Sequence, residues 1–252
     1  MRSLISKILA FVPLLLLLTL WQLVGSSSSR MSFLYSTPTS VLSTLLSELA
    51  TRAFWMDIGV TSSEVIGGLI LGNALGTGLA LVLWLYPRMG DIFRPYVIAL
   101  SSIPIFAVMP LFILWFGIGF GAKIAIVVFS TVFVALAYAL TAAVGLGQKY
   151  EEIIFSFGGT RADLLRKVIV PGVVSRSFVA YRMNVSFALI GAYVAEWVSA
   201  KQGLGQYILR ATSLYDVPHV WAGLIVFIAI AFLLYQTMAA VERKVVPFKE
   251  TS

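Results

Sequence analysis

Long apolar runs, separated only by short polar segments, restrict this chain more than any other feature of its sequence. Of its 252 residues, 60% are hydrophobic and only 12% are charged, whereas a soluble domain usually carries about 25% charged residues. A lipid bilayer admits only helices and closed barrels, because no water is present to satisfy the backbone. The runs are continuous rather than alternating, which indicates helices. We therefore predict an all-α, polytopic membrane bundle that forms one domain over residues 1–252.

Six segments are expected to cross the membrane. The first apolar run, residues 8–24, fits either a retained span or the core of a signal peptide. It has no clear cleavage site, so we expect a retained span with its N-terminus in the cytoplasm. The other five spans are expected at 58–86, 92–116, 123–145, 176–198 and 220–240.

Between the first two spans, apolar residues recur at helical spacing over residues 33–54. This pattern indicates an amphipathic helix that lies on the outer membrane surface. The chain is thus expected to comprise a first span with its flank (1–30), a periplasmic amphipathic segment (31–55) and a core bundle (56–241).

The net charge of +7 is explained by membrane orientation, so no nucleic-acid partner is expected. If both termini are cytoplasmic, most Lys and Arg residues fall on the inner side, as the positive-inside rule requires. The exceptions are Arg30, Arg52, Lys123, Lys201 and Arg210. The chain has no cysteine and one histidine, so neither a thiolate site nor a histidine-rich metal site is expected.

The longest polar interruption, residues 148–171, is predicted to be a compact helix–turn–helix on the cytoplasmic side. One short helix is expected over Glu151–Phe157 and a second over Ala162–Val170. Pro171 should stop the second helix, because proline disfavours the helical conformation for the residue before it.

Local signals define the turn between these two helices. Gly158 and Gly159 can adopt backbone angles that other residues avoid. Thr160 is expected to cap the second helix, with Asp163 at the N3 position of a capping box. Such a knob suits insertion into a groove on a soluble partner. The residues alone also fit an ordinary cytoplasmic loop.

If the bundle encloses a pathway through the membrane, the candidate residues that line it are in the third and fifth expected spans. Proline inside a span frees backbone carbonyls, which is tolerated where the bend is buried or faces a cavity. The third span contains Pro95, Pro104 and Pro110, so its bend is either a structural kink or part of a pathway. The pathway candidates in the two spans are Ser101, Ser102, Pro104, Met109, Asn184 and Ser186.

Two charged residues also lie in the fifth span, where burial is costly. Arg182 is near the inner end and can extend its guanidinium to the interface. Glu196 is near the outer end and is expected to be interfacial. We interpret both as structural residues, with a contribution to gating as the alternative.

The 148–171 segment resembles the EAA loop of ABC importer permeases, with Glu152, Gly158 and Pro171 at the corresponding positions. The chain around it resembles the sulfonate, taurine and nitrate import group, in Ile103-Pro104 followed by LFILWFGIGFGAKI (111–124) and in VAEWVSAKQGLGQYI (194–208). The chain departs from the usual pattern at four positions. The two alanines of the pattern are replaced by Ile153 and Ile154, and a second proline is replaced by Ser175. Glu64 stands where a basic residue is common.

The resemblance implies a type I ABC importer permease with a cytoplasmic coupling helix, in a bacterial inner membrane. It implies two permease copies or two related chains, two ATP-binding cassette subunits that hold ATP and Mg, and a periplasmic binding protein. The implied solute is a small organic or inorganic anion, such as a sulfonate, taurine or nitrate. The residues expected to contact the ATPase are Glu151, Glu152, Phe155, Gly158, Gly159, Thr160, Arg161 and Pro171.

The chain itself has no G-x-x-x-x-G-K-[ST] motif, so it is not expected to bind ATP by that route. No nucleophile–base pair or metal cluster appears in the sequence, so it is not expected to be an enzyme. The alternative is a channel or secondary transporter without an ATPase. A secondary transporter usually needs acidic residues near the midplane. No acid lies clearly at that depth in the sequence.

Overall fold

The computed structural model describes residues 2–199 and 201–245, and these contain helices and turns but no strand. The elements in chain order are α1 (Arg2–Ser26), α2 (Ser29–Tyr35), α3 (Pro38–Leu49), α4 (Arg52–Leu85), α5 (Pro87–Ser101), α6 (Ile105–Phe116), α7 (Phe120–Ser156), α8 (Arg161–Leu164), the π-helical turn η1 (Leu165–Ile169), α9 (Val170–Ser199), α10 (Leu204–Ser213) and α11 (Val217–Val245).

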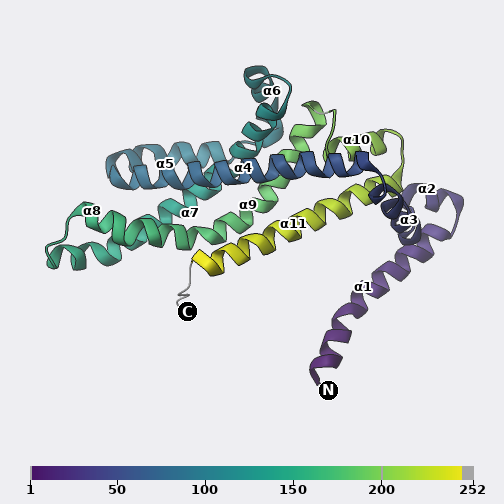
Figure 1. Cartoon of the computed structure of the whole chain (residues 1–252), viewed down its shortest axis with the longest axis horizontal. Coiled ribbons are helices and arrows are strands. Elements are labelled where there is room, and N and C mark those ends of the chain that lie inside the picture. Colours follow the sequence, from purple (N-terminus) through teal and green to yellow (C-terminus); the bar gives the residue numbers. More distant parts are fainter. Residues whose placement is uncertain (1, 200, 246–252) are drawn as a thin grey trace.

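The centre of the molecule is formed by the long helices α4, α7 and α9, which run side by side (Figure 1). Small residues on α4 allow α4 and α7 to approach closely. A Cβ atom added at Gly72 would overlap Thr131, and one added at Gly76 would overlap the backbone of Val132. Gly72 and Gly76 of α4 therefore pack against α7 within one subunit.

Within the described residues, four helices are long and apolar enough to cross a membrane: Arg52–Leu85, Phe120–Ser156, Arg161–Val198 and Val217–Val245. A fifth crossing is formed if the bent pair Pro95–Ser101 and Ile105–Phe116 is one broken span. The apolar part of α1, Phe11–Ser26, is shorter. Each of the six expected spans is thus helical, but the third differs from its prediction.

The third span was expected to be one kinked helix over residues 92–116, and this is wrong. It is two helices, α5 and α6, which meet at 93°. Pro104 explains the break, because it lacks an N–H and forces the preceding Ile103 out of the helical region. Pro95 and Pro110 lie inside α5 and α6 without breaking them.

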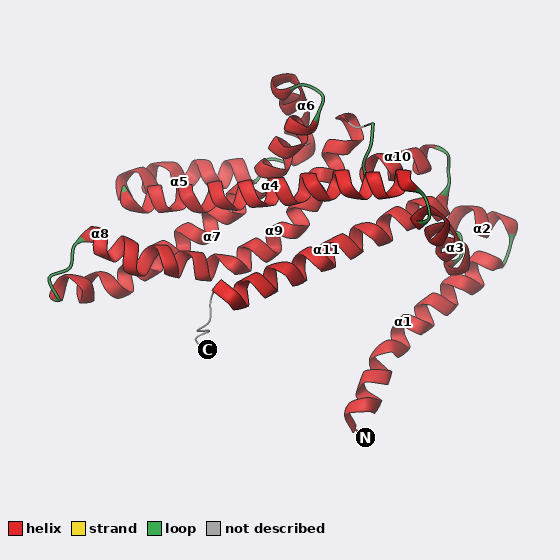
Figure 2. Ribbon diagram, in the orientation of Figure 1, coloured by secondary structure: helices red, strands yellow, loops and turns green. Residues whose placement is uncertain are grey.

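The outer amphipathic segment is also divided, although one helix was expected over residues 33–54. Ser36 ends α2 with a positive φ of 57°, and Thr37 then caps α3, which has Pro38 in its first turn. Thr51 caps α4 in the same way. The short helices α2, α3 and α10 gather at one end of the bundle, and α8 lies at the other (Figure 2).

Helix α1 diverges from the bundle (Figure 1) and touches it mainly through α2 and α3. The rings of Trp21 and Trp221 lie 4.8 Å apart and join α1 to the start of α11.

Candidate functional site

The tip of the molecule, residues 151–164, begins with the last turns of α7. The separate short helix expected over Glu151–Phe157 is not present, because α7 continues without a break to Ser156. Gly158 ends it with a φ of +74°, a left-handed conformation that favours glycine. The N–H of Gly158 donates to the carbonyl of Phe155 and that of Gly159 to the carbonyl of Ile154, both at 2.9 Å. These two bonds form a Schellman motif, so the tight glycine turn is confirmed.

The second half of the tip begins with a capping box, also as predicted. The hydroxyl of Thr160 accepts from the N–H of Asp163, while the Asp163 carboxylate accepts from the Thr160 N–H at 2.9 Å. The same carboxylate pairs with Lys167 at 2.8 Å. The capping box therefore satisfies two backbone N–H groups at the start of α8, those of Thr160 and Asp163.

The prediction that Pro171 stops the second helix is wrong. The π-helical turn η1 follows α8, and α9 then runs through Pro171 to Ser199. In η1 the N–H of Val170 reaches back to the carbonyl of Leu165. This i→i+5 turn widens the helix next to the proline and so accommodates a residue that would otherwise interrupt it. The tip is thus continuous with two long helices, α7 and α9.

The tip exposes apolar side chains among charged ones. Phe157 is 88% exposed, and Phe155 is 44% exposed. Glu151 and Glu152 are exposed beside them. Sequence reasoning missed Phe157, although an aromatic residue directly before a glycine pair is the signal that marks it. An exposed aromatic between acids suits a protein groove better than lipid.

The two isoleucines that depart from the usual EAA pattern have different surroundings in this tip. Ile153 is exposed, whereas Ile154 packs against the inner core cluster that includes Leu164. The guanidinium of Arg161 lies 5.7 Å from the ring centroid of Trp84 on α4. A cavity of 600 Å³ lies at this junction, with Glu151 and Arg161 in its wall. The tip is therefore seated on α4 as well as on its own helices.

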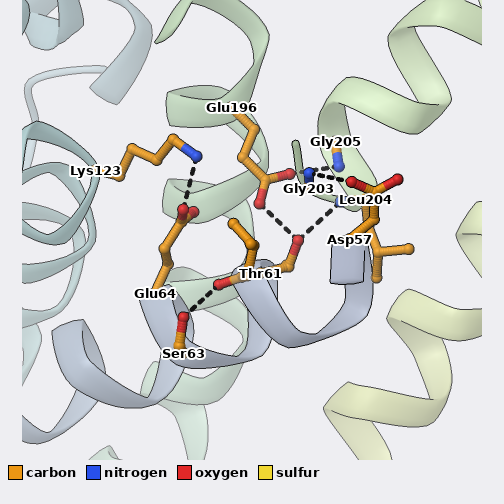
Figure 3. Close-up of polar contacts among 10 residues, drawn as sticks. Asp57, Thr61, Ser63, Glu64, Lys123, Glu196, Gly203, Leu204 and Gly205 are labelled. Atoms are coloured by element: carbon orange, nitrogen blue, oxygen red, sulfur yellow. Dashed lines mark hydrogen bonds and ion pairs between the residues drawn. The ribbon is translucent and has the colours of Figure 1, made fainter. Parts of the chain in front are cut away.

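At the opposite end, side chains from α4 and α9 hold the start of α10 (Figure 3). Three consecutive backbone N–H groups donate to them. Gly203 donates to Asp57 at 2.7 Å, Leu204 to the Thr61 hydroxyl at 2.8 Å, and Gly205 to Glu196 at 2.5 Å. We call these six residues the outer junction.

Glu196 is fully buried, so the expectation that it is interfacial is wrong. Its second carboxylate oxygen accepts from the Thr61 hydroxyl at 2.6 Å. Its neighbour Glu64 is also fully buried and pairs with Lys123 at 2.6 Å (Figure 3). The acid at position 64 thus has its positive partner on α7. These contacts support a structural interpretation of Glu196.

Partial burial affects one further side chain of α10, Tyr207, whose ring packs at a tilt against that of Phe54 with centroids 5.0 Å apart. Burial, and then the charge of Glu48, raises the pKa of Tyr207 well above its ordinary value. Tyr207 is therefore a neutral packing residue.

Three pathway or gating candidates lie in packed positions. Asn184 is fully buried and donates to Asn73 at 2.6 Å, so it does not face a pathway in this conformation. Met109 is buried in an apolar cluster with Ile126. Arg182 pairs with Glu242 at 2.8 Å, which supports its structural interpretation.

The remaining pathway candidates are exposed. Ser186 lies on the surface of α9, and Ser102 and Pro104 lie at the α5–α6 break. Ser101 lies at the same break and lines a cavity of 280 Å³.

Residues 68–247 match the family described as the binding-protein-dependent transport system inner membrane component. The chain belongs to this family. The permease is 27% identical over 236 residues to the formylaminopyrimidine transport permease protein ThiX of Halalkalibacterium halodurans, covering 94% of both chains. It is 26% identical to the taurine transport system permease protein TauC of Escherichia coli, covering 95% of this chain and 89% of that one.

A solved structure of the same fold is an inward-facing conformation of the MetNI methionine ABC transporter. The TM-score is 0.62 at 18% identity, and the match covers 77% of the permease and 94% of the solved chain. The permease is therefore a membrane-embedded transport component with the helical fold expected from its sequence.

Proposed function

We propose that this permease is the non-catalytic membrane subunit of an ATP-driven importer. Two copies, or one copy and a related chain, would form the pathway. Two separate ATP-binding cassette subunits would bind ATP and Mg, and a periplasmic binding protein would deliver the solute. Both termini and the 148–171 segment would face the cytoplasm, with residues 31–55 in the periplasm.

The observation that carries this proposal is the construction of the tip. It is closed by a Schellman motif and a capping box, and it is continuous with two membrane helices. It also presents Phe157 and the two acids outward. A rigid tip of this kind transmits a push from a soluble partner to α7 and α9, which then move as rigid bodies.

Two solute classes are candidates. The sequence resemblance favours a small anion such as a sulfonate, taurine or nitrate, and one relative is named for taurine transport. Another relative, similar over as much of its length, is named for formylaminopyrimidine transport.

The proposal is tested with permease purified from its own host membranes and assayed for Mg-dependent ATP hydrolysis and solute uptake. Glu152→Ala and Gly158→Leu should lower uptake at least about tenfold while ATP hydrolysis by the complex persists, because they alter the contact surface and the left-handed turn. Gly78→Ala is the matched control, since a Cβ there meets nothing within 4 Å. Uptake that stays at the wild-type rate in both tip variants, or that needs no ATPase, would count against the proposal and favour a channel or secondary transporter.

A further inference from the structure

The 280 Å³ cavity, which we call the chamber, lies where the broken span meets α7 and α9. Ser101 lines it from the end of α5, Phe129, Ser130 and Phe133 from α7, and Phe187 from α9. Irregular backbone at membrane depth is tolerated where it lines a cavity, and transporters often bind solutes at broken helices. The 93° break between α5 and α6 is such a place.

Two independent helices give the depth of the chamber. On α7, its residues follow the start at Phe120 by roughly 9 to 14 positions, or about 14–21 Å at the rise of a helix. On α9, Phe187 precedes the end at Ser199 by a similar distance. Because the hydrocarbon core is about 30 Å thick, both helices place the chamber near the membrane midplane.

The part of the chamber wall that the structure describes is aromatic and uncharged. Three phenylalanine rings line it, together with aliphatic side chains and two serines. The rings of Phe129 and Phe133 form an edge-to-face pair with centroids 5.2 Å apart. Flat rings bind such surfaces by stacking. An anion would instead require a positive charge or several hydrogen-bond donors, and none of the lining side chains among the described residues is charged.

The two serine hydroxyls favour a particular polarity in the solute. Ser101 donates its proton to the carbonyl of Ile98 at 2.8 Å, and Ser130 donates to the carbonyl of Ile126 at 2.9 Å. With these protons in use, the hydroxyl oxygens have only lone pairs left to offer. They therefore accept from N–H groups and do not complement an anion.

We infer that the chamber is a solute station on the transport pathway, which takes a flat, uncharged heteroaromatic molecule with N–H donors rather than an anion. The inference rests on the proposed function for the passage of solute through this chain. The volume of the chamber, 280 Å³, suits one small ring system, since pockets for drug-sized ligands begin at about 300 Å³.

The test is saturation-transfer NMR and titration on the permease in lipid nanodiscs, with cytosine and orotate as probes. Both are pyrimidines, but cytosine is neutral and carries an amino group, whereas orotate is an anion. Cytosine should bind, and orotate should bind at least about tenfold more weakly. Phe133→Ala should weaken cytosine binding about tenfold, because it removes a stacking surface.

Phe133→Leu, which keeps the apolar volume, provides a second variant if the alanine variant folds poorly. Phe232→Ala on α11, a ring that is 61% exposed, is the matched control and should leave binding unchanged. Orotate binding as tight as cytosine, no cytosine binding, or equal loss in the Phe133 and Phe232 variants would overturn the inference. Binding is measured without the ATPase, so its result is separate from whether ATP drives transport.

Discussion

At the scale of single residues, both ends of the permease depend on side chains that satisfy backbone N–H groups. At the tip, Thr160 and Asp163 cap each other across three residues, a local arrangement that propensity rules describe. At the outer junction, the carboxylate of Glu196 accepts one hydrogen bond from the hydroxyl of Thr61, which is 135 residues away in the chain, and another from the N–H of Gly205. The second arrangement fixes α10 to two membrane helices.

Glu196→Ala should destabilise the permease far more than the loss of an exposed acid. It leaves a buried hydroxyl and a buried N–H without an acceptor, each at a cost of about 1–3 kcal/mol. We expect the Tm in nanodiscs to fall by at least about 4 °C, since the two lost acceptors cost at least about 2 kcal/mol together and each kcal/mol lowers the Tm by about 2–4 °C in a chain of this size. Glu196→Gln, which keeps one acceptor oxygen, should lower the Tm by about half as much as Glu196→Ala does.

Glu152→Ala is the control for this measurement, because that carboxylate is exposed at the tip. Its Tm should stay within about 1 °C of wild type, as surface substitutions usually change stability by less than about 0.5 kcal/mol. If Glu196→Ala melts at the wild-type temperature, the outer junction does not hold α10 in place.

At the scale of elements, two prolines have opposite effects on the helices that contain them. Pro104 ends one helix and begins another at 93°. Pro171 lies within a continuous helix, because the π-helical turn before it accommodates the ring. Proline alone therefore does not decide whether a span is broken, since the turn that precedes it also matters.

Pro104→Ala should straighten the broken span, because it restores an N–H and removes the restriction on Ile103. The chain has no native cysteine, so spin labels can be placed at Ile98→Cys and Leu114→Cys alone. The distance between the two labels then reports how strongly the span is bent. A straight helix would place these positions about 24 Å apart at 1.5 Å per residue. We expect the distance measured by pulsed electron resonance to be clearly shorter in the protein with Pro104, and to lengthen toward that value in the variant.

Pro110→Ala is the matched control, because Pro110 lies inside α6 without breaking it. Its distance distribution should be unchanged. An identical distribution in the Pro104 variant would mean that packing, not the proline, imposes the break.

At the scale of the whole molecule, the sequence predicts what depends on local chemistry and overall hydropathy. The helical membrane fold, the capping of Thr160 and the turn at Gly158 all follow from neighbouring residues. The burial of Glu196 and Asn184 could not be predicted, because each has a buried side-chain partner, Thr61 and Asn73 respectively, that lies more than 100 positions away in the chain. The positions of Phe157 and of the chamber likewise depend on how whole helices end and meet.

We propose that the tip faces the cytoplasm and contacts a separate ATPase, and labelling of a single cysteine at Phe157→Cys tests this most directly. A membrane-impermeant maleimide should modify this cysteine in inverted vesicles but not in right-side-out ones, and the bound ATPase should slow the reaction at least about tenfold, since buried contacts exclude solvent. Leu214→Cys, 77% exposed at the opposite end, should show the reverse sidedness and no protection. Modification of the Phe157 cysteine from the periplasmic side, or at the same rate with and without the ATPase, would contradict the account.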